Sequence, residues 1–216
     1  MNKNRIGPYH HLLATLLIAL LLPLAATAAD PAPQQMVEQI SDRLLRLLTS
    51  DPGRLATDPE GVYAEADEII APHVDFDRVG RLVLGKYWRR ATPEQRQRFI
   101  AEFRRLVVRS YSTAFNDFGQ WQIRYLPVRR SEDGKRAVVR TRVTRPGAEP
   151  VEVAYHMHWR DDRWLAYDVK VDGISLITNY RNSFSREIRR AGVDGLIRKL
   201  SAMNQRHLKG NDLAAN

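Results

Sequence analysis

The chain has 216 residues, with 34 Lys and Arg against 25 Asp and Glu and a formal net charge of +9 at neutral pH. It has no cysteine, which excludes disulfides, thiolate metal sites and cysteine nucleophiles, so the fold must be stabilised by packing alone. The cations are scattered among carboxylates instead of forming one stripe, a distribution that fits an anionic membrane surface or an acidic protein face better than nucleic acid.

The N-terminal residues have the features of an export signal. Lys3 and Arg5 precede an apolar run over residues 12–22, and Ala26-Thr27-Ala28 has the small-x-small pattern of a cleavage site. The run has about half of the roughly 20 residues that a bilayer-spanning helix needs. We therefore expect a cleaved signal peptide over residues 1–28 and a periplasmic mature chain without a membrane span or nucleic-acid partner; the alternative is an uncleaved anchor.

Residues 35–118 are predicted to be mostly helical. Apolar residues recur at intervals of three and four over 35–49, 59–70, 75–85 and 92–118. The last of these stretches has the strongest start signal, because Thr92-Pro93-Glu94-Gln95 combines a capping residue, a proline in the first turn and a glutamine that can reach back to the cap. A long helix is expected there.

From Trp121 the period changes to two. Polar and apolar side chains alternate over 121–128, 135–145, 151–160 and 163–171, and the short connectors predict four strands in an antiparallel meander. Helical spacing then returns after Gly173, with a pause at Gly192, and residues 209–216 are expected to be a disordered tail. The sequence thus predicts an α+β fold over residues 29–208, one domain whose sheet is covered on one face by N- and C-terminal helices.

The register of the last two strands follows from their faces. Val151, Val153, Tyr155, Met157 and Trp159 share one side of the third strand, whereas Leu165, Tyr167, Val169 and Val171 share one side of the fourth. A two-residue turn would pair Trp159 with Trp164 and set these two apolar sides on opposite faces, while an odd-length loop or a bulge would align them. We predict the odd register, in which Trp159 does not face Trp164.

Few residues have the pattern of a catalytic or metal site. His156 and His158 share a strand face, but no third zinc ligand is evident, so two solvent-side histidines are the expected reading. Asp168 lies among apolar residues and is either a general base or, more simply, a carboxylate paired with an arginine. Ser175 lacks the second glycine of a nucleophile elbow. These patterns do not favour an enzyme, and taken alone they favour a solidly packed core.

Two segments carry a family resemblance. The first runs through Asp75-Phe76-Asp77-Arg78-Val79, Leu84-Gly85-Lys86-Tyr87-Trp88-Arg89, Ala91-Thr92-Pro93-Glu94-Gln95-Arg96 and Phe99; the second runs from Tyr167 to Leu176 and continues through Asn179-Tyr180-Arg181 and Phe184. Together they resemble the MlaC (toluene-tolerance) family of periplasmic phospholipid-binding proteins over about residues 35–208.

The resemblance implies a non-enzymatic phospholipid carrier with an apolar cavity and no cofactor. It further implies shuttling between an outer-membrane lipoprotein and porin complex and an inner-membrane ABC transporter complex, in a system that maintains outer-membrane lipid asymmetry. A hydrolase or isomerase with Asp168 as base, and a scaffold that binds only proteins, are the alternatives. The expected lipid-binding residues are Tyr111, Phe115, Val139, Val143, Val153, Tyr155, Met157, Leu165, Tyr167, Val169, Ile174, Ile177 and Tyr180.

Overall fold

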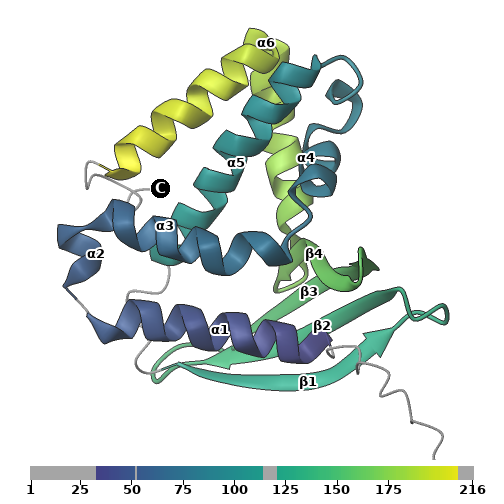
Figure 1. Ribbon diagram of the computed structural model, residues 1–216. Coiled ribbons are helices and arrows are strands. Elements are labelled where there is room, and N and C mark those ends of the chain that lie inside the picture. Colours follow the sequence, from purple (N-terminus) through teal and green to yellow (C-terminus); the bar gives the residue numbers. More distant parts are fainter. Residues whose placement is uncertain (1–32, 52, 114–120, 209–216) are drawn as a thin grey trace, which may run out of the picture. The chain divides into compact units, whose positions relative to one another are not determined.

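The computed structural model describes residues 33–51, 53–113 and 121–208 (Figure 1). The expected signal peptide, the expected tail and the last residues of the helix predicted over 92–118 lie outside these ranges. In the described part of the chain, no helix is both long and apolar enough to cross a bilayer.

The helices begin where capping side chains satisfy free backbone N–H groups. Asp58 accepts a hydrogen bond from the Gly61 N–H at 3.0 Å, and Thr92 and Gln95 exchange two bonds of 3.0 and 3.2 Å, which is the predicted reciprocal cap. The helical elements are α1 (Pro33–Ser50), α2 (Arg54–Thr57), α3 (Pro59–Ile70), η1 (Ala71–His73), α4 (Phe76–Leu84), η2 (Gly85–Tyr87), α5 (Pro93–Thr113) and α6 (Leu176–Leu208).

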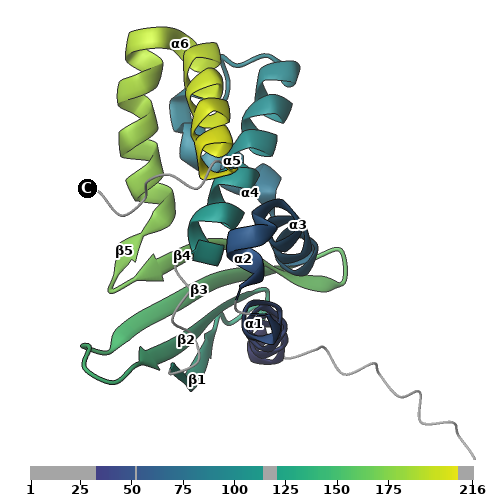
Figure 2. The same ribbon diagram turned by 90° about the vertical axis from the view of Figure 1, so that its left-hand side faces the viewer.

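Gly192 divides α6 into two segments. Its backbone angles, φ 71° and ψ 179°, lie in a region that is open essentially to glycine alone. Figures 1 and 2 show α6 as two segments that fold back on each other, and the break at Gly192 is the pause that the sequence predicts.

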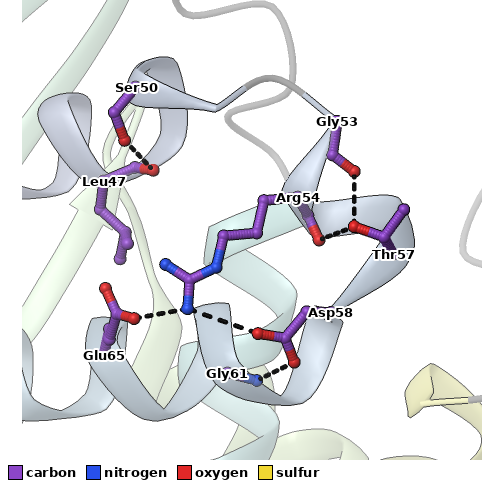
Figure 3. A network of polar contacts seen from close by, with 8 residues as sticks. All are labelled: Leu47, Ser50, Gly53, Arg54, Thr57, Asp58, Gly61 and Glu65. Atoms are coloured by element: carbon purple, nitrogen blue, oxygen red, sulfur yellow. Dashed lines mark hydrogen bonds and ion pairs between the residues drawn. The ribbon is translucent and has the colours of Figure 1, made fainter.

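A polar network holds the corner between α1 and α3 (Figure 3). Arg54 Nη2 lies 2.6 Å from Glu65 Oε1 and 3.4 Å from Asp58 Oδ2, while Thr57 Oγ1 donates to the Gly53 carbonyl at 3.3 Å. Because the two carboxylates are about half exposed, these ion pairs add little stability. Their role is geometric, since they orient the short α2 between its neighbours.

The strands form one antiparallel sheet in the order β1-β2-β3-β4-β5. Its members are β1 (Gln122–Arg130), β2 (Arg136–Thr144), β3 (Val151–Arg160), β4 (Arg163–Val171) and β5 (Ile174–Ser175). The predicted α+β class and four-stranded meander are confirmed, with one addition. Asp172 and Gly173 both have positive φ, so the chain turns tightly and adds the two-residue strand β5 to the edge of β4.

The predicted register of β3 and β4 is wrong at the turn. Trp159 pairs with Trp164, because Asp161 and Asp162, at φ 50° and 56°, form a two-residue turn of the kind that favours positive φ at both positions.

A bulge then restores the alignment of the two apolar sides. Met157 pairs with Ala166 but His156 pairs with Asp168, so Tyr167 is an extra residue in β4. Beyond this bulge Tyr155 faces Val169 on the neighbouring strand. The alignment that the sequence predicted is therefore reached inside the strand instead of at the turn.

Helix α1 lies over one face of the sheet (Figure 1), which we call the inner face; α4 contacts the other face, where Arg78 lies 3.0 Å from His158. Between α4, α5 and α6, the rings of Phe99, Phe103 and Phe184 pack edge to face or stacked with centroids 5.6–6.1 Å apart. A second buried cluster joins α1 to the inner face of the sheet and consists of Met36, Val37, Ala137, Val139, Met157 and Trp164. Both clusters consist of buried side chains.

Candidate functional site

A cavity of about 370 Å³ lies between the inner face of the sheet and the helices. Its volume falls in the range of small-molecule sites, about 300–1,000 Å³. The apolar lining comes chiefly from α1, the four long strands and the start of α6, and includes Met36, Val37, Ile40, Leu44, Leu45, Leu48, Ile123, Val143, Val151, Val153, Tyr155, Ala166, Val169, Val171, Leu176, Ile177 and Tyr180.

The two periodicities of the sequence explain this lining. Ile40, Leu44 and Leu48 are four residues apart and therefore share one face of α1. Val151, Val153 and Tyr155 alternate along β3 and therefore point to one face of the sheet. The helix face and the sheet face meet around the cavity.

The tyrosines of this region remain neutral near pH 7. Burial raises the pKa of Tyr155 to about 12 and also raises the pKa values of Tyr125 and Tyr180. Burial, reinforced by the charges of Arg43 and Arg163, lowers the pKa of His73, which lines the cavity, so this imidazole is also neutral. Such a lining suits apolar groups.

Asp168 is the one acidic residue among the described lining residues, and it binds the start of α6. Its carboxylate accepts hydrogen bonds from Ser175 Oγ at 2.8 Å and from the Ile177 N–H at 3.3 Å. Ser175 Oγ in turn accepts from the Thr178 N–H at 3.1 Å. Neither the general base nor the arginine pair considered from sequence describes this geometry, which is that of a helix N-terminus held by a carboxylate.

The two strand histidines have separate surroundings. His158 lies between Arg78 Nη1, 3.0 Å from its Nδ1, and Asp75 Oδ2, 3.0 Å from its Nε2, and the Arg78 guanidinium stacks 3.9 Å from the Tyr167 ring centroid. Burial, followed by the charge of Arg78, lowers the pKa of His158. His156 is half-buried and points to the same sheet face. Among the residues that the structure describes, no group of three or more potential ligands gathers for a metal.

The structure brings seven of the expected lipid-binding residues together around the cavity: Val143, Val153, Tyr155, Tyr167, Val169, Ile177 and Tyr180. Val139 and Met157 lie instead in the solid cluster beneath α1, and Leu165 is buried but pairs with His158 on the opposite face. Ile174 is 66% exposed. Tyr111 lies in α5, where only the backbone is described, and Phe115 lies outside the described residues.

The lining residues that the sequence interpretation missed come mainly from α1. The signal was available, because Met36, Ile40, Leu44 and Leu48 form an apolar face at helical spacing. An apolar helix face does not by itself distinguish the side of a cavity from the side of a packed core, and this is why the residues could not be assigned.

Known proteins share both the sequence and this architecture. The family model "MlaC protein" matches residues 38–202. The toluene tolerance protein ttg2D of Pseudomonas putida is 30% identical over 169 residues, 78% of each chain, and the intermembrane phospholipid transport system binding protein MlaC of Haemophilus influenzae is 22% identical over 205 residues, 93% of this chain and 94% of its own.

A solved structure with the same fold is that of a phospholipid-binding protein from Ralstonia solanacearum in complex with a phospholipid. It is 31% identical, covers 81% of this chain and 98% of its own, and superimposes with a TM-score of 0.72. The family match, the agreement in fold and the shared sequence lead to one conclusion: this chain belongs to the MlaC family.

Proposed function

We propose that this chain is a phospholipid carrier that holds acyl chains in the cavity beneath α1. The observation that carries the proposal is the cavity itself, about 370 Å³ of space lined by aliphatic and aromatic side chains in a fold whose Ralstonia solanacearum relative was solved with a phospholipid. The carboxylate of Asp168, which lines the cavity, is engaged by Ser175 Oγ and the Ile177 N–H at the start of α6. A carrier without catalysis is the function that this geometry supports best.

The physical need for such a cavity is large. Each acyl methylene exposed to water costs about 0.8 kcal/mol, so a phospholipid with some thirty of them faces more than about 20 kcal/mol on leaving a bilayer. A carrier must remove most of that surface from water. Apolar walls from α1 and from the inner face of the sheet offer a place for both chains, and the headgroup then needs few specific contacts.

The site of action belongs to the same proposal. The chain works in the periplasm after removal of residues 1–28, and exchanges lipid with an inner-membrane ABC transporter complex and an outer-membrane lipoprotein and porin complex. What supports this is the membership of the MlaC family, one relative of which is named as the binding protein of an intermembrane phospholipid transport system.

Native mass spectrometry of the full chain purified from cells tests the cargo. The expected spectrum shows one phospholipid per protein. Val153→Trp fills the cavity from the centre of β3, so this variant should carry less than a tenth of the lipid of the wild type.

Ala154→Trp is the matched control, because it adds the same ring to the adjacent residue, which points to the other face of the sheet. It should retain the lipid. Near-UV circular dichroism verifies that both variants fold. The proposal is wrong if wild-type protein carries no phospholipid and the delipidated protein takes up none from vesicles.

A further inference from the structure

The face of the sheet opposite α1 carries a cluster of cations, beside the part of that face, at His158, that α4 contacts. Strand alternation places them opposite the cavity lining: Ile123 and Val143 point inward, and their neighbours Arg124 and Arg142 point outward. We define the basic sheet face as Arg124, Arg129, Arg136, Arg140, Arg142 and Lys170, of which Arg140 and Lys170 are half-buried and the others exposed.

The pairing of the strands brings these cations close to one another. Arg124 is directly opposite Arg142, and Arg140 lies two residues from Arg142 on the same face of β2. Lys170 is opposite Ala154, which is itself opposite Arg140, so the row continues across β3. Like charges in directly opposed positions oppose sheet formation. Their accumulation here therefore has no explanation in the stability of the sheet.

Few carboxylates balance this charge. No member of the basic sheet face lies within ion-pair distance of an acidic side chain in the described part of the chain, and the Arg140 Nε is buried without a hydrogen-bond partner there. The acidic residues on these strands that share the face are Glu152, opposite Arg142, and Asp168, which is held by Ser175. The cations of this face can therefore pair with anionic groups from outside the molecule.

We propose that the basic sheet face adsorbs to the headgroups of an anionic membrane. The choice of a membrane over an acidic protein rests on what the face lacks. Protein interfaces derive most of their affinity from buried aromatic and large apolar side chains. Ile174 is the one large hydrophobic residue exposed on the described surface, and its partner Val171 lines the cavity, so Ile174 belongs to the inner face. Leu126, Val138 and Ala154, the aliphatic residues between the cations, are half-buried.

Cations alone are sufficient for adsorption to anionic lipids. Each Lys or Arg near such a surface contributes about 1 kcal/mol, which corresponds to about fivefold in affinity, and the contribution disappears within a Debye length. Six of them give contact that is reversible and sensitive to salt. The cavity lies on the other side of the same strands, so this contact leaves the proposed cargo site unobstructed.

Co-sedimentation with vesicles tests the inference. The full chain should bind vesicles of phosphatidylcholine and phosphatidylglycerol mixed two to one, and should not bind vesicles of phosphatidylcholine alone. The triple variant Arg124→Gln, Arg129→Gln, Arg142→Gln removes three exposed cations and should bind the anionic vesicles about 100-fold more weakly. Raising NaCl from about 0.1 M to about 1 M should abolish wild-type binding, because the Debye length falls from about 10 Å to about 3 Å.

The matched control is the triple variant Arg186→Gln, Arg189→Gln, Arg198→Gln. It removes the same charge from exposed positions on α6 and should bind almost as the wild type does. Equal losses in the two triple variants would show that net charge matters and the basic sheet face does not. The proposal is also overturned if the wild-type protein does not bind anionic vesicles but binds an acidic protein through these arginines. Native mass spectrometry measures the phospholipid bound to both triple variants, so that a loss of membrane adsorption is distinguished from a loss of cargo.

Discussion

At the scale of single residues, the contacts of His158 make the stability of the fold depend on pH. The imidazole lies between Asp75, which is only 6% exposed, and Arg78; Arg160 lies 3.4 Å from Asp75, and the Tyr167 ring packs edge-on against the imidazole. Burial and the two guanidiniums disfavour a proton on His158 more than Asp75 favours it, so its pKa is lowered from 6.5. The unfolded chain then binds the proton more readily than the folded chain does.

The sign of the effect follows from linkage. As pH falls below about 6.5 the unfolded state gains a proton that the folded state does not, so the free energy of unfolding decreases until the folded pKa is reached. His158→Gln removes this titration. We expect urea unfolding between pH 7.5 and 5 to show a weaker dependence on pH in the variant, by at most about 1.4 kcal/mol per pH unit, the limit for one proton.

Two other histidines provide the comparison. The pKa values of His73 and His156 are also lowered by burial, His73 beside Arg43 and Arg163 and His156 beside Lys170, with Asp168 opposing. Part of the dependence on pH should therefore persist in His158→Gln. At pH 8, where the imidazoles are neutral, the difference in free energy of unfolding between His158→Gln and the wild type measures only the contacts that the variant has lost. A slope identical to that of the wild type would contradict the assignment.

At the scale of elements, the joint between β4 and α6 depends on Asp168. The bulge at Tyr167 shifts the register of β4. The Asp168 carboxylate that follows it accepts hydrogen bonds from Ser175 Oγ and the Ile177 N–H at the start of α6. Hydrogen bonds to a charged group contribute about 1.5–3 kcal/mol, and a negative charge is also favourable at a helix N-terminus.

Replacement of Asp168 tests this joint. Asp168→Ala should lower the free energy of unfolding by about 2 kcal/mol, and Asp168→Asn, which keeps an acceptor, by about half as much. Chemical denaturation measures both. Lipid content in native mass spectra should be almost unchanged in Asp168→Asn. Equal stability of the three proteins would show that the carboxylate does not hold α6.

The elements illustrate how far the sequence is informative. Helices and strands follow from local periodicity, so α3, β3 and β4 agree with their predicted bounds. A bulge was named as one way to align the two apolar sides, but its position at Tyr167 and the strand β5 were not predicted, because they depend on how β4 meets its neighbours and the start of α6. Local patterns contain no record of such long-range fitting.

The lining of the cavity could be predicted only in part, for the same reason. The alternation along β2 correctly places Val139 and Val143 on one face, but Val139 lies in solid packing and Val143 lines the cavity. Which of the two occurs depends on the neighbouring helix. Met36 and Val37, at the beginning of α1, touch both the buried cluster on the strands and the cavity, whereas Leu44, Leu45 and Leu48 farther along belong to the cavity lining alone. The distance between a helix and a sheet is set by tertiary packing and does not follow from local sequence patterns.

At the scale of the whole described fold, the sheet separates two kinds of surface. Its inner face turns aliphatic side chains toward the cavity, and its outer face holds the basic sheet face. If the cavity is the cargo site, the protein without cargo keeps apolar walls without a complementary surface. Dispersion contacts are lost wherever a void faces the lining, so the empty form should be less stable than the loaded form.

Removal of lipid measures this coupling. A ligand that binds only the folded state stabilises it by RT ln(1 + [L]/Kd), about 2.7 kcal/mol at a free concentration one hundred times Kd. Delipidated wild-type protein should therefore unfold at a lower urea concentration than lipid-loaded protein, and added phospholipid should restore the midpoint. Val153→Trp, with its cavity filled, should give the same midpoint with and without lipid, whereas Ala154→Trp should respond as the wild type does. An unchanged wild-type midpoint would mean that phospholipid does not bind the folded chain in preference to the unfolded chain, since binding to the folded state alone must shift the equilibrium toward it.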